Sequence, residues 1–236
     1  MGHDTLVVNA TLTGNTSNST IIDLGDGNDS AVVNYAVSDY YFKLGDGKDT
    51  MTIAGTGVTN LAVDLGSGYD TLVINTTLTG TSNTAANSVV QLGGGNDIVT
   101  VNSNISNYRI DGGALNDTLV INANLNNTIV TGGAGADSIV FSSGTVTGGQ
   151  LSVGVASPAA DGADTLTIAT GAKGVGTFIT NFSGAQDTLI IGGTIITGLA
   201  SLAIGSYNAA LYAATAGSNV ALYSWLADGG NRITLV

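Results

Sequence analysis

Aspartate is the residue type in this chain whose pattern could do chemistry, and it recurs at the end of a glycine-rich stretch. DLGDGND ends at Asp29, KLGDGKD ends at Asp49 and DLGSGYD ends at Asp70. Such a stretch offers carboxylate and backbone oxygens only, a donor set that suits a hard cation with six to eight oxygen ligands. All seventeen acidic residues are Asp and none is Glu, which indicates a specific use of Asp rather than general solvation of a surface.

These aspartates follow a period of about twenty residues. The spacings between successive members are 25, 20, 21, 27, 20, 20, 27 and 23 residues. Self-similarity at such a period is typical of stacked repeat proteins. The column consists of Asp4, Asp29, Asp49, Asp70, Asp97, Asp117, Asp137, Asp164 and Asp187.

An alternating segment follows each Asp of the column. The residues two and four positions on are apolar in every copy, as in Leu72 and Ile74, which predicts the inner face of a strand. A second, looser strand precedes each glycine-rich turn, as at 40–45 and 88–93. Two short strands cannot bury their own apolar face, so successive units must stack in parallel. The sequence therefore predicts an all-β fold, a right-handed parallel β-roll or β-solenoid of about nine coils of ~20 residues with a β-rich C-terminal cap.

Stacking would bring the aspartates into one column. Neighbouring strands lie ~4.8 Å apart, and two carboxylates at that distance repel by about 0.9 kcal/mol even at the dielectric of water. A cation between them would remove this repulsion, and Ca²⁺ fits better than Mg²⁺, which needs strict octahedral geometry and retains water. The alternative is an ion-free turn in which each Asp caps backbone amides.

The turns resemble a known family of repeats. TGGAGADSIVF at 131–141 matches the nonapeptide G-G-x-G-x-D-x-U-x of the RTX (repeats-in-toxin) calcium-binding β-rolls. QLGGGNDIV, DLGDGNDSA and KLGDGKDTM resemble it with Leu in place of the first Gly, and the likeness spans most of residues 1–145. The resemblance implies that turn carbonyls and the Asp carboxylate bind Ca²⁺ together with the adjoining turn. The implied metal-binding positions are Gly25, Asp26, Gly27, Asp29, Gly45, Asp46, Gly47, Asp49, Gly66, Ser67, Gly68, Asp70, Gly93, Gly94, Gly95, Asp97, Gly113, Ala114, Asp117, Gly133, Ala134, Gly135 and Asp137.

The chain also departs from that family's pattern. The usual RTX coil has two such turns, whereas each unit here has one glycine-rich turn and one turn rich in Asn and Thr. We therefore expect several Ca²⁺ ions in one row, mainly along a single edge of the roll. Leu115 replaces a turn glycine, and the stretches before Asp164 and Asp187 depart further, so the number of ions should fall toward the C-terminus.

The patterns divide the chain into three parts. Residues 1–145 are predicted to form the calcium-binding RTX-like roll, with repeats that continue upstream in the native chain. Residues 146–192 are predicted to form degraded, ion-poor coils. Residues 193–236 are predicted to form a C-terminal cap and secretion region. Segments 176–193 and 219–236 resemble the closing region of type I secreted RTX proteins, including bacterial surface-layer (S-layer) proteins. Tyr212, Tyr223 and Trp225 are interpreted as packing residues of this cap.

Composition excludes several classes of partner. Five basic residues cannot form the cationic face that nucleic acid requires. No apolar run reaches the roughly 18 residues of a membrane span, and no cleaved N-terminal signal is recognisable. The chain has no Cys, no Glu and one His, His3, so we expect no catalytic residues, no organic cofactor and no enzyme activity.

These observations predict a structural extracellular protein of the bacterial cell surface. Ca²⁺ would drive its folding and its self-assembly into a surface layer after type I secretion, and cell-surface polysaccharide is a further candidate partner. Two alternatives stay open. The chain could be the folding and secretion module of a larger RTX toxin, hydrolase or adhesin, or it could be an ice-binding roll, since Thr5, Thr50, Thr71 and their equivalents form an outward ladder.

Overall fold

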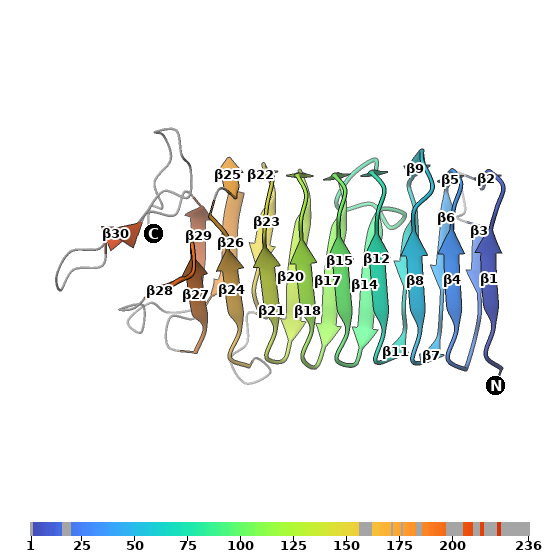
Figure 1. Ribbon diagram of the computed structural model, residues 1–236, viewed down its shortest axis with the longest axis horizontal. Coiled ribbons are helices and arrows are strands. Elements are labelled where there is room, and N and C mark those ends of the chain that lie inside the picture. The colour runs from blue at the N-terminus through green and yellow to red at the C-terminus, as the bar shows by residue number, and fades with distance from the viewer. Residues whose placement is uncertain are drawn as a thin grey trace.

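The fold is an all-β parallel solenoid, as predicted (Figure 1). The computed structural model describes residues 2–15, 20–155, 162–170, 172–175, 177–182 and 186–196, with strands at 205–209, 213–214 and 221–222. In this part of the chain no helix is long and apolar enough to cross a membrane. Stacked coils therefore supply the architecture that positions the Asp column.

The segments that follow the column aspartates form a ten-stranded sheet. Equivalent residues of successive coils pair directly, for example Leu72 with Met51 and with Val99. The first nine strands run parallel and the last is antiparallel. In sheet order they are β1 (Thr5–Val8), β4 (Ser30–Val33), β8 (Thr50–Ile53), β12 (Thr71–Ile74), β15 (Ile98–Val101), β18 (Thr118–Ile121), β21 (Ser138–Phe141), β24 (Thr165–Ile168), β27 (Thr188–Ile191) and β28 (Thr194–Ile196).

The segments that precede and enter the glycine-rich turns form an eleven-stranded sheet. From Val89 to Gly94 one strand continues through the first half of the turn, whereas earlier coils divide it in two. The strands are β3 (Thr20–Asp23), β6 (Tyr40–Lys43), β7 (Asp46–Gly47), β10 (Ala62–Asp64), β11 (Ser67–Gly68), β14 (Val89–Gly94), β17 (Arg109–Ala114), β20 (Ile129–Ala134), β23 (Gln150–Ser152), β26 (Thr177–Phe182) and β29 (Gly205–Ala209).

A third sheet lies where sequence analysis expected only a turn rich in Asn and Thr. Its strands are β2 (Leu12–Thr13), β5 (Val37–Ser38), β9 (Val58–Thr59), β13 (Leu78–Thr79), β16 (Ile105–Ser106), β19 (Leu125–Asn126), β22 (Thr145–Thr147) and β25 (Lys173–Val175). They are mostly two residues long, too short for a periodic pattern, yet those from β5 to β22 each place an apolar side chain such as Leu78 or Ile105 in the core. Each coil therefore has three strands around one interior.

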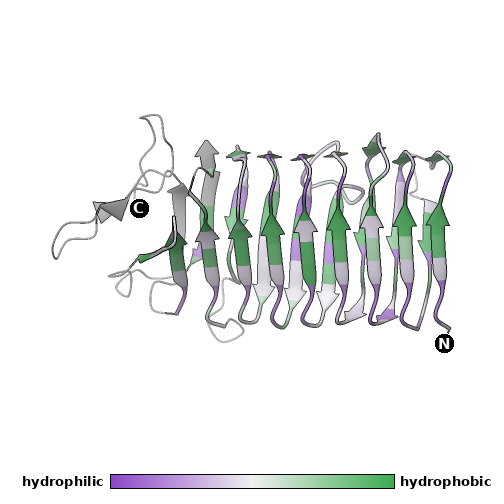
Figure 2. Cartoon of the chain, viewed as in Figure 1, coloured by the Kyte–Doolittle hydropathy of each residue, from purple (hydrophilic) through white to green (hydrophobic). Residues whose placement is uncertain are grey.

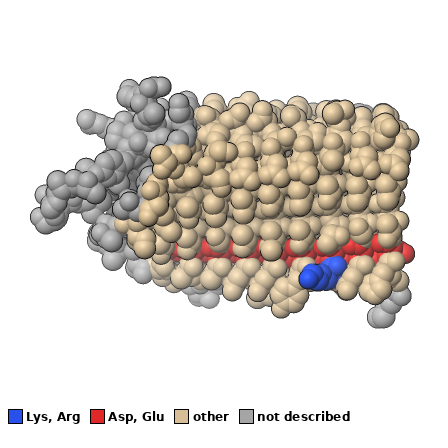
Figure 3. All heavy atoms as spheres, in the orientation of Figure 1, with Lys and Arg blue, Asp and Glu red and all other residues tan. Residues whose placement is uncertain are grey.

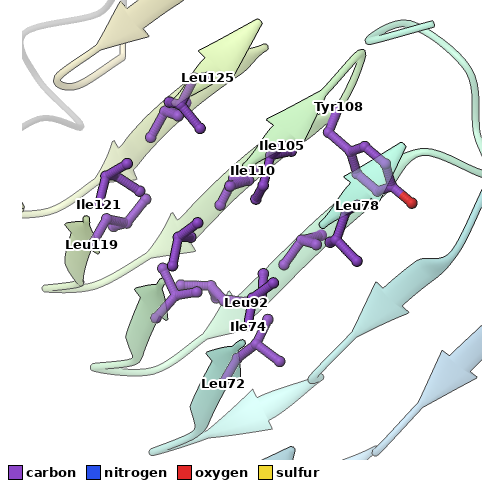
Figure 4. Close-up of a cluster of buried hydrophobic side chains, with 14 of the residues drawn as sticks. Leu72, Ile74, Leu78, Leu92, Ile105, Tyr108, Ile110, Leu119, Ile121 and Leu125 are labelled. Carbon is purple, nitrogen blue, oxygen red and sulfur yellow. The ribbon is translucent and has the colours of Figure 1, made fainter. Parts of the chain in front are cut away.

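The core is a continuous apolar column inside the three sheets. Figure 4 shows Leu72, Leu92 and Leu125, one from each sheet, directed into this interior. The predicted inward positions are buried wherever their side chains are described, except Leu6 in the first coil, which is half-buried. Figure 2 shows that apolar residues predominate along the strands, so the direction of each side chain separates the core positions from the outer ones. Period-two alternation therefore accounts for the core.

The C-terminal end changes strand direction. β28 pairs antiparallel with β27, and β29 pairs antiparallel with β26. A further hairpin joins β30 (Ala213–Ala214) and β31 (Ala221–Leu222). These strands agree with the predicted β-rich cap, whereas Tyr212, Tyr223 and Trp225 lie outside the described residues.

Tyr108 joins two coils that are not neighbours. Its hydroxyl accepts a hydrogen bond from the backbone N–H of Leu61 at 2.9 Å, and its side chain is fully buried. Register places Ser88 between these two residues in the stack. Because Ser88 is small, the Tyr108 ring can reach past it to the next coil.

We expect the substitution Tyr108→Phe to lower the free energy of unfolding by ~1–3 kcal/mol, since the buried N–H of Leu61 would lose its acceptor. Urea denaturation followed by circular dichroism measures this change. Tyr35→Phe, which removes the hydroxyl of a half-exposed ring, serves as the control and should stay within ~0.5 kcal/mol of the parent. Equal effects of the two substitutions would contradict the assigned role of Tyr108.

Candidate functional site

The column aspartates form a continuous hydrogen-bonded ladder along one edge of the solenoid. In every link the backbone N–H of one Asp donates to Oδ1 of the Asp in the next coil, as Asp49 does to Asp70 at 2.7 Å. Eight such links run from Asp4 to Asp187, with N to O distances of 2.7 to 3.1 Å. Figure 3 shows the acidic row spanning the length of the roll. The predicted column is therefore present. In each link Oδ1 caps a backbone amide, which is the role that the ion-free alternative gave to these aspartates.

The second carboxylate oxygen has a different environment. From Asp29 to Asp164 no column Asp is more than 2% exposed. Among the described residues, no hydrogen-bond donor reaches the buried Oδ2 atoms of Asp29, Asp49, Asp70, Asp97 and Asp117. A buried carboxylate oxygen without a donor strongly disfavours the ionised form. At Asp49, Asp70, Asp97 and Asp117 the ladder therefore favours a proton or a cation beside this oxygen.

The pKa values of the ladder reflect this burial. Desolvation raises the pKa of Asp70 to about 7; the amide bond from Asp49 opposes the shift, and the charges of Asp97 and Asp49 add to it. Desolvation likewise raises the pKa of Asp117 to about 8. The pKa values of Asp49 and Asp97 are raised by the same cause. Near neutral pH the carboxylates of Asp70 and Asp117 therefore still bind protons unless another positive charge replaces them.

Two columns of glycine allow the turns to approach one another. Gly95 has φ +154°, and a Cβ placed on it would lie 1.4 Å from the carbonyl oxygen of Gly68 in the preceding coil. Gly45, Gly66 and Gly93 form the other column, again with positive φ and a neighbouring carbonyl where a side chain would be. Leu115 interrupts the first column and adopts φ +76° as an exposed residue. Backbone proximity, rather than flexibility, therefore explains these glycines.

Several turn carbonyls that the RTX resemblance assigns to Ca²⁺ already accept hydrogen bonds. Gly45 O accepts from Ser67 N at 2.9 Å, and Gly66 O accepts from Gly94 N at 2.8 Å. Asp46 O accepts from Gly27 N at 2.8 Å. In these early turns the adjoining coils therefore bond directly to each other through the oxygens that a cation would need.

The residue that opens the turn distinguishes early coils from later ones. Leu44, Leu65 and Leu92 occupy this position in the early coils and are fully buried in the core. Register places Gly112 opposite Leu92, and Gly132 follows in the next coil.

Two oxygens face the space that a side chain on Gly112 would fill. A Cβ there would lie 2.6 Å from Oδ2 of Asp117 and closer still to the carbonyl oxygen of Gly132. At Gly132 the same space is faced by Oδ2 of Asp137, at 2.7 Å from such a Cβ, and by the Val153 carbonyl. Converging, buried oxygens fit a hard cation. The turns of Asp117 and Asp137 therefore fit Ca²⁺ better than the leucine-bearing turns.

The remaining predicted site residues lie apart from the buried ladder. Asp26 and Asp46 are exposed on the outside of adjacent turns, where the Ser67 hydroxyl donates to Asp46. The part of the chain that the structure describes contains no group of three or more His, Cys, Asp or Glu side chains that could hold a metal. A cation in these turns would therefore take most of its ligands from the backbone.

Asparagine ladders are the polar feature that sequence reasoning missed. The Asn127 amide donates to Oδ1 of Asn107 at 2.8 Å, and the Asn122 amide donates to Oδ1 of Asn102 at 2.9 Å. The recurrence of Asn at one repeat position was the sequence signal that could have predicted these ladders. These ladders bind coil to coil on the outside, as the Asp ladder does within.

No family model, curated protein or solved structure matches this chain.

Adjacent glycines offer a matched test of turn packing. We expect Gly95→Ala to lower the free energy of unfolding by about 3 kcal/mol or more, because the new Cβ would collide with the Gly68 carbonyl. Gly94→Ala should stay within ~0.5 kcal/mol, since a Cβ there meets nothing within 4 Å. Chemical denaturation of both variants measures the difference, and similar losses would count against the packing described for Gly95.

The raised pKa values predict an unusual pH dependence of the metal-free chain. The folded state binds protons that the unfolded state releases near the usual Asp pKa of 3.8. The resulting stabilisation is complete below that value and is lost as the pH rises through about 7 and 8. In EGTA the urea midpoint should therefore be higher at about pH 5 than at about pH 9.

Asp117→Asn is the companion variant for this measurement. It keeps an oxygen to accept the Asp97 amide but cannot ionise. We expect its urea midpoint to change less between the two pH values than that of the parent. A parent chain that becomes more stable with rising pH would refute the assignment of buried, protonated carboxylates.

Proposed function

We propose that this chain is a non-enzymatic, structural repeat protein of the bacterial cell surface, of the RTX β-roll kind. In this proposal Ca²⁺ stabilises the solenoid, and the folded chain assembles into a surface layer. The observation that carries the proposal is the row of buried carboxylates, joined from coil to coil, in which Oδ2 of Asp49, Asp70, Asp97 and Asp117 meets no hydrogen-bond donor among the described residues. The repeat thus uses its acidic residues to connect coils, which supports a structural role.

The candidate ligands are oxygens of consecutive coils. Asp117 and Asp137 would supply carboxylate oxygen, and Gly132 and Val153 would supply carbonyl oxygen. Bound there, Ca²⁺ would supply positive charge beside the buried carboxylate of Asp117, whose Oδ2 meets no donor among the described residues. The leucine-bearing turns, with Asp29, Asp49, Asp70 and Asp97, are the weaker candidates on the same reasoning. Several ions in one row remain the expectation for the whole edge.

Such a site would couple Ca²⁺ to folding. Its oxygens come from residues far apart in the sequence, so they converge only in the stacked state. A ligand that binds only the folded state adds its binding free energy to the folding free energy. A chain of this kind would fold poorly where Ca²⁺ is scarce and fold fully outside the cell. This behaviour suits export by type I secretion.

Thermal unfolding with and without Ca²⁺ tests the proposal. We expect the unfolding temperature at neutral pH to be higher in millimolar CaCl₂ than in excess EGTA, because Ca²⁺ would bind only the folded chain. Asp117→Asn should reduce this gain, whereas Asp26→Asn, on an exposed carboxylate, should leave it unchanged. Circular dichroism provides the measurement.

Identical unfolding in CaCl₂ and EGTA would overturn the role of Ca²⁺. Assembly is tested separately by electron microscopy of the protein with Ca²⁺ present. Ordered sheets are expected, and dispersed particles at high concentration would contradict the surface-layer role.

A further inference from the structure

The outer surface of the ten-stranded sheet is regular and uncharged. Its outward side chains are the first and third residues after each column Asp, and every one is Thr, Ser, Val or Ile. We call this surface the Thr/Val face. Its first rank is Thr5, Ser30, Thr50, Thr71, Ile98, Thr118, Ser138, Thr165 and Thr188, and its second rank is Val7, Val32, Thr52, Val73, Thr100, Val120, Val140, Thr167 and Ile190.

The pairing register makes this face a regular array. Each outward residue lies beside its equivalent in the next coil, as Thr71 does beside Thr50 and Val73 beside Thr52. The same register continues from β1 to β27. In Figure 3 the acidic row runs along the edge of the roll and leaves a broad uncharged surface beside it. The face therefore presents two straight ranks of hydroxyl and branched apolar side chains.

The outer surface of the eleven-stranded sheet has a different character. Asp23, Lys43 and Asp64 occupy neighbouring positions there. Arg109 pairs with Asp111 further along the same surface. Of these two long surfaces, the Thr/Val face is thus the one that can approach a copy of itself without bringing like charges together.

We propose that the Thr/Val face is the contact surface between two copies of this chain, packed sheet on sheet about a two-fold axis. This inference rests on the proposed function, because it names the face through which self-assembly begins. Each chain carries a formal charge of −12 at pH 7, so the surfaces that expose aspartates repel one another. No like charges meet where two uncharged faces are in contact. A two-fold contact uses the same patch on both partners, so a patch without charge suits it.

The size of the face sets the expected affinity. Nine strands at ~4.8 Å and four residues at ~3.3 Å give a face of ~43 by ~13 Å. Two such faces together cover roughly 1,100 Å², which is just below the size of standard specific interfaces. We therefore expect a weak dimer with a dissociation constant in the micromolar range. Full overlap is favoured because any shift along the array buries less area.

A matched pair of lysine substitutions tests the face. Thr100 lies on β15, the middle one of the nine parallel strands, and Thr131 lies on β20 of the eleven-stranded sheet; both side chains are half-buried and point outward. Thr100→Lys should raise the dissociation constant by about a hundredfold, since like charges would meet near the two-fold axis. Thr131→Lys should leave it unchanged. Sedimentation equilibrium over a range of concentrations, on chains shown to be folded by circular dichroism, gives both values.

Cross-linking gives a second readout that does not depend on affinity. The chain has no Cys, so a single introduced thiol reports one position. Thr100→Cys should form a covalent dimer under mild oxidation, and Thr131→Cys should not. Equal cross-linking of the two variants would contradict a contact through the Thr/Val face.

The outcomes separate this inference from the proposed function. A folded chain that stays monomeric at every concentration overturns the dimer, whatever its response to Ca²⁺. If Thr131→Lys abolishes association and Thr100→Lys does not, the chain self-assembles, but through a surface other than the Thr/Val face. A dimer whose unfolding ignores Ca²⁺ overturns the calcium proposal alone. A monomer that inhibits ice growth, with the activity lost in Thr100→Lys, assigns the face to ice instead of a second copy.

Discussion

The structure depends on one repeated hydrogen bond, from the backbone N–H of each column Asp to the carboxylate of the Asp in the next coil. A parallel stack of similar strands could slip in register, and a slip of one residue would turn every core side chain outward. The link opposes slippage because donor and acceptor belong to the same repeat position. Its cost is the burial of an acidic side chain in every coil from Asp29 to Asp187, and that burial determines the electrostatics of the edge.

Burial and glycine together explain the shape of the turn. The turn position beside the carboxylates holds a leucine directed into the core in the early coils, a glycine at Gly112 and Gly132, and the buried Val153 in the coil that follows. In the leucine-bearing turns the leucine side chain fills the core beside the Asp. At Gly112 and Gly132 a carboxylate oxygen and a carbonyl oxygen of the next coil lie where a side chain would be. The roll thus contains turns of different structure, although their aspartates are equivalent.

The outer surfaces of the two large sheets carry different kinds of side chain. The ten-stranded sheet carries hydroxyl and branched apolar side chains, and the eleven-stranded sheet carries aspartates with basic and aromatic partners, such as Tyr41 donating to Asp64 and Lys43 lying over the Tyr41 ring. Because the backbone repeats at every coil, the residue type at one repeat position recurs along the length of the roll and gives each surface a uniform character. A repeat protein gains extended, uniform faces in this way, and the interior needs only one pattern to support them.

The amino-acid sequence by itself determined the period, the inward apolar positions and the Asp column, because these depend on residues at fixed short spacings, as in Asp70, Leu72 and Ile74. It did not reveal the two-residue strand at Leu78, whose length is below any periodic signal. Nor did it show that Oδ1 of Asp70 is taken by the Asp49 amide while Oδ2 has no donor, or that Tyr108 reaches past Ser88 to Leu61. Only the tertiary structure decided these features, because each depends on the distance and direction between atoms that stacking brings together from residues twenty or more positions apart.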